Sequence, residues 1–331
     1  MLIVLFGILA VPGQAALEKP AYDAGDRWVY VLQGSLDRLP GLNASQGGVS
    51  ELGLTGIVQV DVTSADATGV RAETHASGFL NGTFVIPGNT TVRASGTFSS
   101  DATELWEGQD FLPVVSNSST AYAVDVTVVV TAQVTVDLWL NATTSYASLP
   151  PFDLDIGESG STPFTSQLEA ATTVSAFGFG QHRENRTTIA GEWTRHVLGR
   201  ENVSVEAGTF AAYRINQSLG GFPGLAAVVP SSGANETAWF SNETGNYVRR
   251  VAYVNGTQVA EMRLKSYTYP APSRGLGVAE IAGLLAVPVA VVAVLGFLIL
   301  RRRRARLEKT KTSSGVEPVG ELPPKRPGGT P

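Results

Sequence analysis

The feature that most constrains this chain is residues 122 to 140, YAVDVTVVVTAQVTVDLWL, in which apolar and polar side chains alternate. Successive side chains of a β-strand point to opposite faces, so this period of two predicts a strand with one buried and one solvated face. The odd positions are mostly Asp, Thr and Gln, and they mark the solvated face. The predicted buried face carries Tyr122, Val124, Val126, Val128, Val130, Ala132, Val134, Val136, Leu138 and Leu140.

The length of this stretch predicts that the strand bends. At about 3.3 Å per residue it would reach roughly 60 Å, which is longer than a domain of this size is wide. The alternation is interrupted at residues 128 to 130, Val-Val-Val, where we expect a β-bulge. The sequence therefore predicts a mainly β fold, built from curved antiparallel sheets or a half-barrel.

Other strands and turns follow from shorter patterns. Asn81-Gly82 and Asn255-Gly256 are hairpin-turn signals, and residues 101 to 111 are compatible with one short helix. A Pro/Gly/Ser-rich passage at 148 to 163 predicts a boundary between an N-terminal β lobe, 16 to 148, and a C-terminal β lobe, 149 to 268. The further predicted strands are 27 to 33, 56 to 63, 69 to 80, 83 to 86, 165 to 176, 192 to 205, 209 to 217, 237 to 241, 246 to 254 and 258 to 268.

The two ends of the chain predict export and a membrane anchor. Residues 1 to 15 are apolar and end in small residues, as a signal peptide does. Residues 281 to 300 carry no charge, and twenty helical residues span about 30 Å, the thickness of the bilayer's hydrocarbon core. We expect a stalk at 269 to 277, a transmembrane helix at 278 to 300 and a disordered basic cytoplasmic tail at 301 to 331. The alternative is a buried soluble helix followed by a tail that binds nucleic acid.

Charge divides at the same place. Residues 301 to 331 hold nine Lys/Arg and three Asp/Glu, which is a net charge of +6. The whole chain has a net charge of −5, so residues 1 to 300 carry −11. An acidic ectodomain without interleaved basic and aromatic residues argues against a nucleic-acid partner.

Eleven of the twelve asparagines begin an Asn-x-Ser/Thr triplet without Pro. Ser and Thr make up 56 of 331 residues, so chance would place only about two there. Polar turn chemistry alone explains Asn in turns but not the residue two places later. The excess predicts N-glycosylation and an extracellular location. The predicted sites are Asn43, Asn81, Asn89, Asn117, Asn141, Asn185, Asn202, Asn216, Asn235, Asn242 and Asn255.

Cysteine is absent, which excludes disulfides, thiol chemistry and a lipobox anchor. Heavy sequon use without cysteine leads us to expect an archaeal surface glycoprotein.

A predicted hairpin carries the resemblance to a known group. In ENVSVEAGTFAAYRINQS, residues 201 to 218, Val205, Gly208, Thr209 and Phe210 form a Val-x-Ala-Gly-Thr-Phe motif, and Glu206 is expected to be a solvated turn residue. With GDRWVY at 25 to 30 and AWFSNETGNYVRR at 238 to 250, this order resembles the TapB-like exported β proteins. That group is similar in turn to the LolA and LppX lipoprotein carriers. The resemblance implies a curved antiparallel sheet, an envelope location and, by analogy, a lipid ligand. It carries no catalytic residues.

Catalytic and metal motifs are weak. His182, Glu184, Glu192 and His196 could be gathered as metal ligands, but their spacing fits no familiar pattern, and DLDIGE at 153 to 158 lacks a calcium-loop oxygen. We therefore expect no cofactor, no metal site and no catalytic residue. Trp139 falls on the solvated face of its strand, so it could contact a ligand or a second lobe, although a core role is favoured.

These observations favour a non-enzymatic, membrane-anchored surface glycoprotein whose partners are the bilayer and other envelope proteins. The alternative is a binding module whose concave sheet holds a lipid or other hydrophobic ligand, and a surface hydrolase is the third reading. A filled core would favour the first, and a large apolar cavity the second.

Overall fold

The computed structural model describes residues 17, 19–35, 49–66, 69–86, 90–106, 113–127, 131–148, 152–176, 179–218 and 234–269. The chain divides into two compact units, residues 1–272 and 273–331. The predicted signal peptide, transmembrane helix and basic tail lie outside the described residues, as does all of the predicted stalk except Tyr269. Within the described residues, no helix has both the length and the apolar character needed to cross a membrane.

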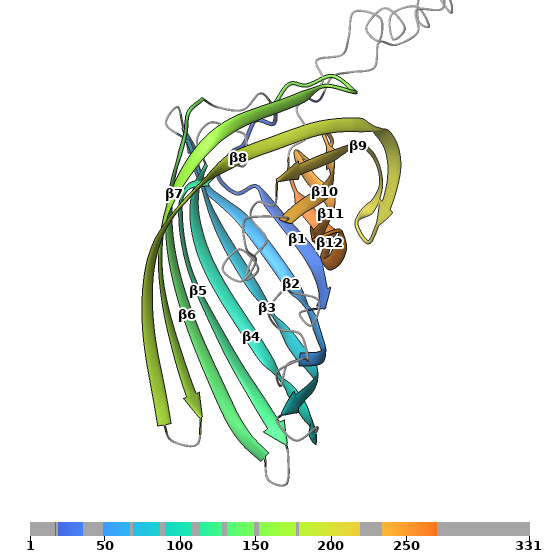
Figure 1. Ribbon diagram of the computed structural model, residues 1–331. Helices are drawn as coiled ribbons and strands as arrows, with labels where there is room; N and C mark the ends of the chain where they lie inside the picture. Colours follow the sequence, from blue (N-terminus) through green and yellow to red (C-terminus); the bar gives the residue numbers. More distant parts are fainter. Residues whose placement is uncertain are drawn as a thin grey trace, which may run out of the picture. The chain divides into compact units, whose positions relative to one another are not determined.

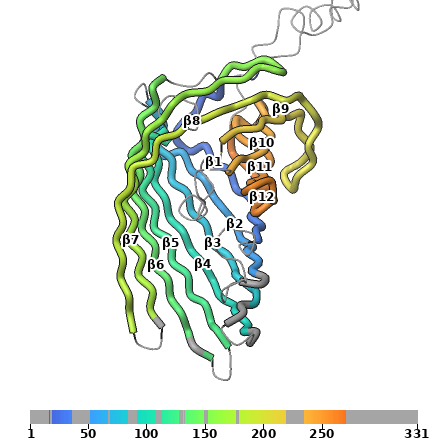
Figure 2. The backbone as a smooth tube through the Cα atoms, in the orientation of Figure 1, coloured from blue at the N-terminus to red at the C-terminus, as the bar shows by residue number. Residues whose placement is uncertain are grey.

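The described residues of the first unit form twelve β-strands that close into a barrel (Figure 1). Each strand pairs antiparallel with the next along the chain, and β12 returns to pair with β1, as the course of the backbone also shows (Figure 2). The predicted mainly β, antiparallel fold is confirmed, and the sheet is closed where a curved sheet or half-barrel was expected. The strands are β1 (Arg27–Ser35), β2 (Val49–Asp66), β3 (Gly69–Ile86), β4 (Thr90–Trp106), β5 (Pro113–Thr127), β6 (Thr131–Tyr146), β7 (Ser159–Ala176), β8 (Phe179–Val205), β9 (Gly208–Ser218), β10 (Ala234–Ser241), β11 (Asn246–Val254) and β12 (Thr257–Thr268).

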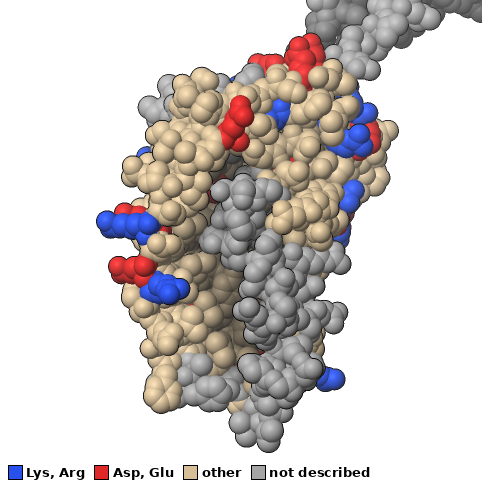
Figure 3. Space-filling model, viewed as in Figure 1, with Lys and Arg blue, Asp and Glu red and all other residues tan. Residues whose placement is uncertain are grey.

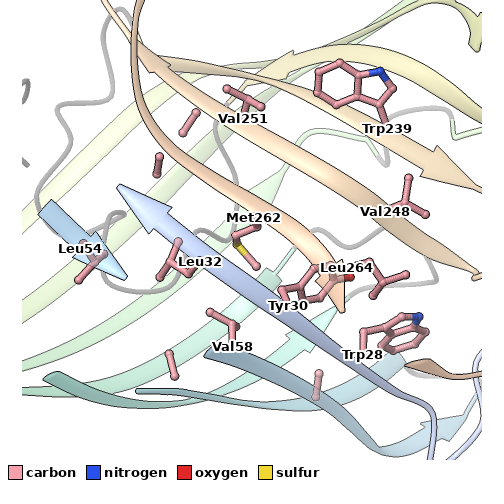
Figure 4. Packing of buried hydrophobic residues seen from close by; sticks show 14 of the residues in the cluster. Trp28, Tyr30, Leu32, Leu54, Val58, Trp239, Val248, Val251, Met262 and Leu264 are labelled. Atoms are coloured by element: carbon pink, nitrogen blue, oxygen red, sulfur yellow. The ribbon is translucent and has the colours of Figure 1, made fainter. Parts of the chain in front are cut away.

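One face of the sheet, which we call the inner face, carries the core. Residues directly opposite one another on paired strands share a face, and Leu32 of β1 pairs with Met262 of β12, which pairs with Arg250 of β11. Figure 4 shows how these strands bring their apolar side chains together. Alternation explains this arrangement, because every second residue of β1 and β2 is apolar and turned inward. On this face the buried cluster includes Trp28, Tyr30, Leu32, Leu54, Val58, Val248, Met262 and Leu264, while Trp239 and Val251, at alternate positions, are buried on the opposite face.

A second buried cluster extends the inner face through β8, β9 and β10. Ile215 pairs with Ala238, and Ala238 pairs with Arg250, so their side chains point to the same face as the core. Phe152 and Leu154, from the segment that follows β6, pack into this cluster. Together the two clusters fill this part of the barrel with packed side chains. The second cluster consists of Leu17, Phe152, Leu154, Val197, Tyr213, Ile215, Ala238, Phe240 and Tyr247.

The stretch 122 to 140 is two strands where one bent strand was predicted. β5 ends at Thr127, β6 begins at Thr131, and these two residues pair with each other, so the chain reverses direction between them. The predicted bulge at 128 to 130 lies outside the described residues, and the alternation that continues across them gives no sign that β5 ends at Thr127. The predicted faces are correct for the described positions, but even-numbered residues such as Val126 and Leu138 are only half-buried.

Two local predictions were also wrong. Asn81 and Gly82 lie inside β3, where Gly82 pairs with Leu52 of β2 and with Ala94 of β4. Pairing on both sides outweighs the turn preference of this dipeptide. Asp101–Trp106 belongs to strand β4 and not to a helix. The turn at Asn255-Gly256 is confirmed, with positive φ at both residues.

The sheet crosses the predicted boundary at 148/149 without a break. β6 and β7 pair along thirteen positions, from Val134 opposite Ala176 to Tyr146 opposite Phe164. The two predicted β lobes are thus parts of one continuous sheet.

A glycine in β3 allows the strands to come close together. A Cβ on Gly78 would lie 2.1 Å from the backbone oxygen of Thr55 and 2.6 Å from the Phe98 ring. The Phe98 ring thus covers the glycine on the inner face, where a larger residue could not fit.

Candidate functional site

The predicted hairpin motif forms the β8–β9 hairpin. Val205 pairs with Gly208 across a two-residue loop, and Gly208 has φ +140°, as the turn requires. Phe210 is 4% exposed and packs edge-on against Tyr267 of β12, with ring centroids 5.9 Å apart. The Ala207 amide donates to the Leu264 carbonyl at 3.1 Å. The motif therefore fixes the hairpin against β12.

Glu206, at the tip of this hairpin, is not a purely solvated turn residue. Arg263 of β12 donates from Nε and Nη2 to its Oε1, at 3.2 and 3.0 Å. This hydrogen-bonded partner lowers the pKa of the Glu206 carboxyl. Arg263 also donates to Gln33 of β1. The pair lies partly exposed at the surface and links the hairpin to the barrel.

A buried polar network on the inner face had not been predicted. Glu236 of β10 is 0% exposed, and Arg250 of β11 donates to both of its carboxylate oxygens, with Nη2 at 3.0 and 2.8 Å. Gln217 of β9 donates to Glu236 at 2.6 Å and to the Tyr247 hydroxyl at 3.1 Å. Burial raises the pKa of the Glu236 carboxyl, and the Arg250 charge opposes that rise. The sequence signals were an Arg inside the predicted strand 246 to 254 and a Glu directly before the predicted strand 237 to 241.

Arg195 of β8 extends this network. Its Nε donates to Gln217 at 3.2 Å, and its guanidinium lies 4.6 Å from the ring centroids of both Phe152 and Trp193. It is 1% exposed, and its Nη1 has no hydrogen-bond partner among the described residues. Arg250 and Arg195 thus both act on the buried Glu236 carboxylate, and the Arg250 charge also opposes the burial-induced rise in the pKa of the Glu104 carboxyl. A sequestered, hydrogen-bonded carboxylate suits a structural network better than proton transfer to a substrate.

The four residues considered as possible metal ligands, His182, Glu184, Glu192 and His196, do not form a metal-binding group. His182 and His196 lie fourteen residues apart along β8, where they pair with Thr173 and Ser159 of β7 respectively. His182 instead contacts Thr173 at 2.9 Å and Glu184 at 3.2 Å. In the DLDIGE passage, the Glu158 carboxylate accepts from the Asp155 amide of its own turn. Among the described residues, no group of three His, Cys, Asp or Glu side chains is placed to hold a metal ion.

Nine of the eleven sequon asparagines lie in the described residues, and Asn43 and Asn89 lie outside them. Asn141 and Asn242 are partly buried, and Asn117 of β5 pairs directly with Asn141 of β6. The remaining seven, which are exposed to solvent, are Asn81, Asn117, Asn185, Asn202, Asn216, Asn235 and Asn255.

The hollows lined by described residues include an open groove of about 860 Å³ on the outer face, the face opposite the core. One row of direct pairs, formed by Phe79, Thr97, Ala123 and Thr135, crosses it from β3 to β6. A smaller hollow of about 220 Å³ is lined by Trp139 and Asn117. On the described surface in Figure 3, acidic and basic side chains are scattered and do not form a patch of one sign.

Comparison with known proteins adds little to this picture. No family model matches the chain, and no curated protein matches it significantly. A Bacteroides fragilis protein described as exported and as having a YmcC-like fold is 11% identical, covering 77% of this chain and 100% of its own, with a TM-score of 0.29. A Parabacteroides distasonis protein described as a lipoprotein is 12% identical, covering 77% and 99%, with a TM-score of 0.26. TM-scores this low do not show that this chain shares the fold or the role of either protein. The TapB-like and LolA-like relation and the archaeal source stay predictions.

Proposed function

We propose that this chain is a membrane-anchored, N-glycosylated cell-surface protein that acts as a non-enzymatic structural or interaction component of the envelope. The observation that carries the proposal is the placement of the sequons. Seven of the nine described sequon asparagines are exposed, so an oligosaccharide can be attached there without disturbing the core. Glycans at these seven sites would form a hydrated coat on the barrel.

The interior supports a structural role. The inner face of β9 to β12 is filled by two apolar clusters and by the Arg195–Gln217–Glu236–Arg250 network. This filled part of the interior favours a rigid surface module over a container for a ligand. The paired carboxylate also has no free position for a substrate.

Protease treatment of intact cells tests the topology. The basic run after residue 300 is expected to hold the tail inside, with the barrel outside. External protease should remove the barrel and spare an epitope placed after Arg306. Cleavage of that epitope from outside would contradict the proposal.

One observation favours lipid binding as the second candidate function. The even-numbered residues of β6, including Val134, Val136, Leu138 and Leu140, form an apolar row that is only half-buried. An acyl chain could cover such a row. Native mass spectrometry of the purified, deglycosylated protein would distinguish the two roles, because a carrier should retain a lipid of defined mass and a structural module should not.

A further inference from the structure

Among the described residues, three large aromatic side chains are exposed to solvent, and two of them, Phe79 and Trp139, lie on the outer face, while Phe179 lies on the opposite face. Phe79 of β3 is 67% exposed and Trp139 of β6 is 43% exposed. The neighbouring Leu80 is 4% exposed and faces the core, which places Phe79 and Asn81 on the outer face. A large apolar ring held in water on a regular strand usually marks a surface that something else covers.

Each of the two rings lies two residues before a sequon asparagine in the sequence. Phe79 precedes Asn81, and Trp139 precedes Asn141, by two residues on a continuous strand, in the sequences FLNGT and WLNAT. Residues two apart on a strand share a face and lie about 7 Å apart. The first sugar on each asparagine therefore starts beside the preceding ring, within reach of it.

The surroundings of each ring leave room for a sugar. Phe79 lines the groove of about 860 Å³, and Asn81 lies in the next row of residues on the same face. Trp139 lines the hollow of about 220 Å³. Asn117, which also lines that hollow, pairs directly with Asn141. The hollow thus lies next to two sequons.

We propose that Phe79 and Trp139 are platforms for the N-linked oligosaccharides of Asn81 and Asn141, whose proximal pyranose rings stack on them. One face of a pyranose ring presents C–H groups and is apolar, so it packs flat against an aromatic ring as another hydrophobic group would. The sugar covers the exposed ring, and the ring orders the sugar along the surface. This inference rests on the glycosylation in the proposed function.

Tryptophan fluorescence can test the proposal at one site, because Trp139 is the only exposed tryptophan. The other four, Trp28, Trp106, Trp193 and Trp239, are at most 8% exposed. Quenching by acrylamide, measured on the full-length glycoprotein in detergent, should therefore report on Trp139, and a Trp139→Phe variant identifies its contribution. Glycopeptide mass spectrometry gives the occupancy of every sequon in the same samples.

Asn141→Gln should raise the quenching constant of Trp139 about twofold, because a stacked sugar covers one of the two faces of the indole. The matched control is Asn216→Gln, which removes an exposed sequon on β9 that follows Arg214 in place of an aromatic residue. It should leave quenching unchanged.

Each other outcome is decisive. If Asn141 carries a glycan and Asn141→Gln leaves quenching unchanged, the platform is refuted while the glycoprotein proposal stands. The platform is also refuted, and the glycoprotein proposal also stands, if Asn141 is unmodified while other sequons are occupied, or if quenching rises in Asn117→Gln but not in Asn141→Gln. If no sequon is occupied, both proposals fail together.

Thermal unfolding tests the Phe79 platform. Asn81→Gln should lower Tm in the otherwise wild-type glycoprotein but not in a Phe79→Ala background, because the stabilising contact needs both partners. An equal Tm loss in the two backgrounds would show that the glycan acts without the ring.

Discussion

Replacing Arg250 with Met should destabilise the barrel strongly, because it removes the cation that is hydrogen-bonded directly to a buried carboxylate. Glu236 is 0% exposed and accepts three hydrogen bonds from Arg250, between 2.8 and 3.1 Å. Removing one partner of such a buried pair costs about 3 to 5 kcal/mol. Met retains most of the apolar stem of the arginine, so little of this cost comes from lost packing.

A double-mutant cycle separates the pair from its surroundings. Glu236→Gln alone should also destabilise, since Arg250 would then lose the charged partner of its three hydrogen bonds. Combining it with Arg250→Met should cost less than the sum of the single changes, by about 1 to 3 kcal/mol, because the two groups interact directly. The coupling should survive 1 M salt, since buried charges are screened little.

Urea unfolding followed by circular dichroism, on a fragment ending at Pro272, measures these free energies. The matched control is Arg186→Met, which breaks the exposed Arg186–Glu169 pair at 3.2 Å. Arg186→Met should lower the free energy of unfolding by at most about 0.5 kcal/mol, and this difference from wild type should disappear in 1 M salt. An Arg250→Met variant that unfolds at the same urea concentration as Arg186→Met would refute the reasoning.

Three further predictions concern the hairpin and the sheet. Phe210→Ala should cost about 3 to 5 kcal/mol by opening a cavity, and Gly208→Val about 1 to 3 kcal/mol through backbone strain; equal midpoints for variants and wild type in thermal unfolding would contradict the hairpin packing. Glu206→Gln should cost at most about 1 kcal/mol near neutral pH. Arg263 lowers the pKa of the Glu206 carboxyl in the folded protein. The ion pair therefore stabilises the fold fully above the unfolded-state pKa of about 4.3, and this stabilisation is lost as pH falls through the lower folded-state pKa. In urea titrations across pH, a difference between Glu206→Gln and wild type that persists in stronger acid would argue against the ion pair. Gly78→Ala should destabilise by at least about 1 to 3 kcal/mol, since its Cβ would lie 2.1 Å from a backbone oxygen of β2; an unchanged unfolding free energy would show that the strands can separate there.

Much of the fold could be predicted because alternation is a local signal. The inward face of β1, with Trp28, Tyr30 and Leu32 buried, follows from period two alone. The Gly208 turn was predictable because few residues other than glycine adopt positive φ there.

Closure of the barrel could not be predicted in this way. It depends on β1 pairing with β12, whose residues are more than two hundred positions away, and no local pattern encodes that contact. The division of residues 122 to 140 into β5 and β6 could not be predicted for a related reason. The alternation continues across the three valines between Thr127 and Thr131, so it gives no sign of a break there.

The inner polar network was missed because a single sequence does not show which charged residues are buried. Glu236 follows a sequon asparagine and looks like a surface residue until Gln217 and Arg250 are placed opposite it. Similarly, the exposure of Phe79 became informative only when β3 was known to continue through Asn81 without a turn.

Glycopeptide mapping of the protein isolated from its own membrane tests the central claim most directly. The account predicts hexose-containing additions on the exposed asparagines Asn81, Asn117, Asn185, Asn202, Asn216, Asn235 and Asn255. Peptides that contain these residues and carry no sugar at any site would contradict the account of this chain as a surface glycoprotein.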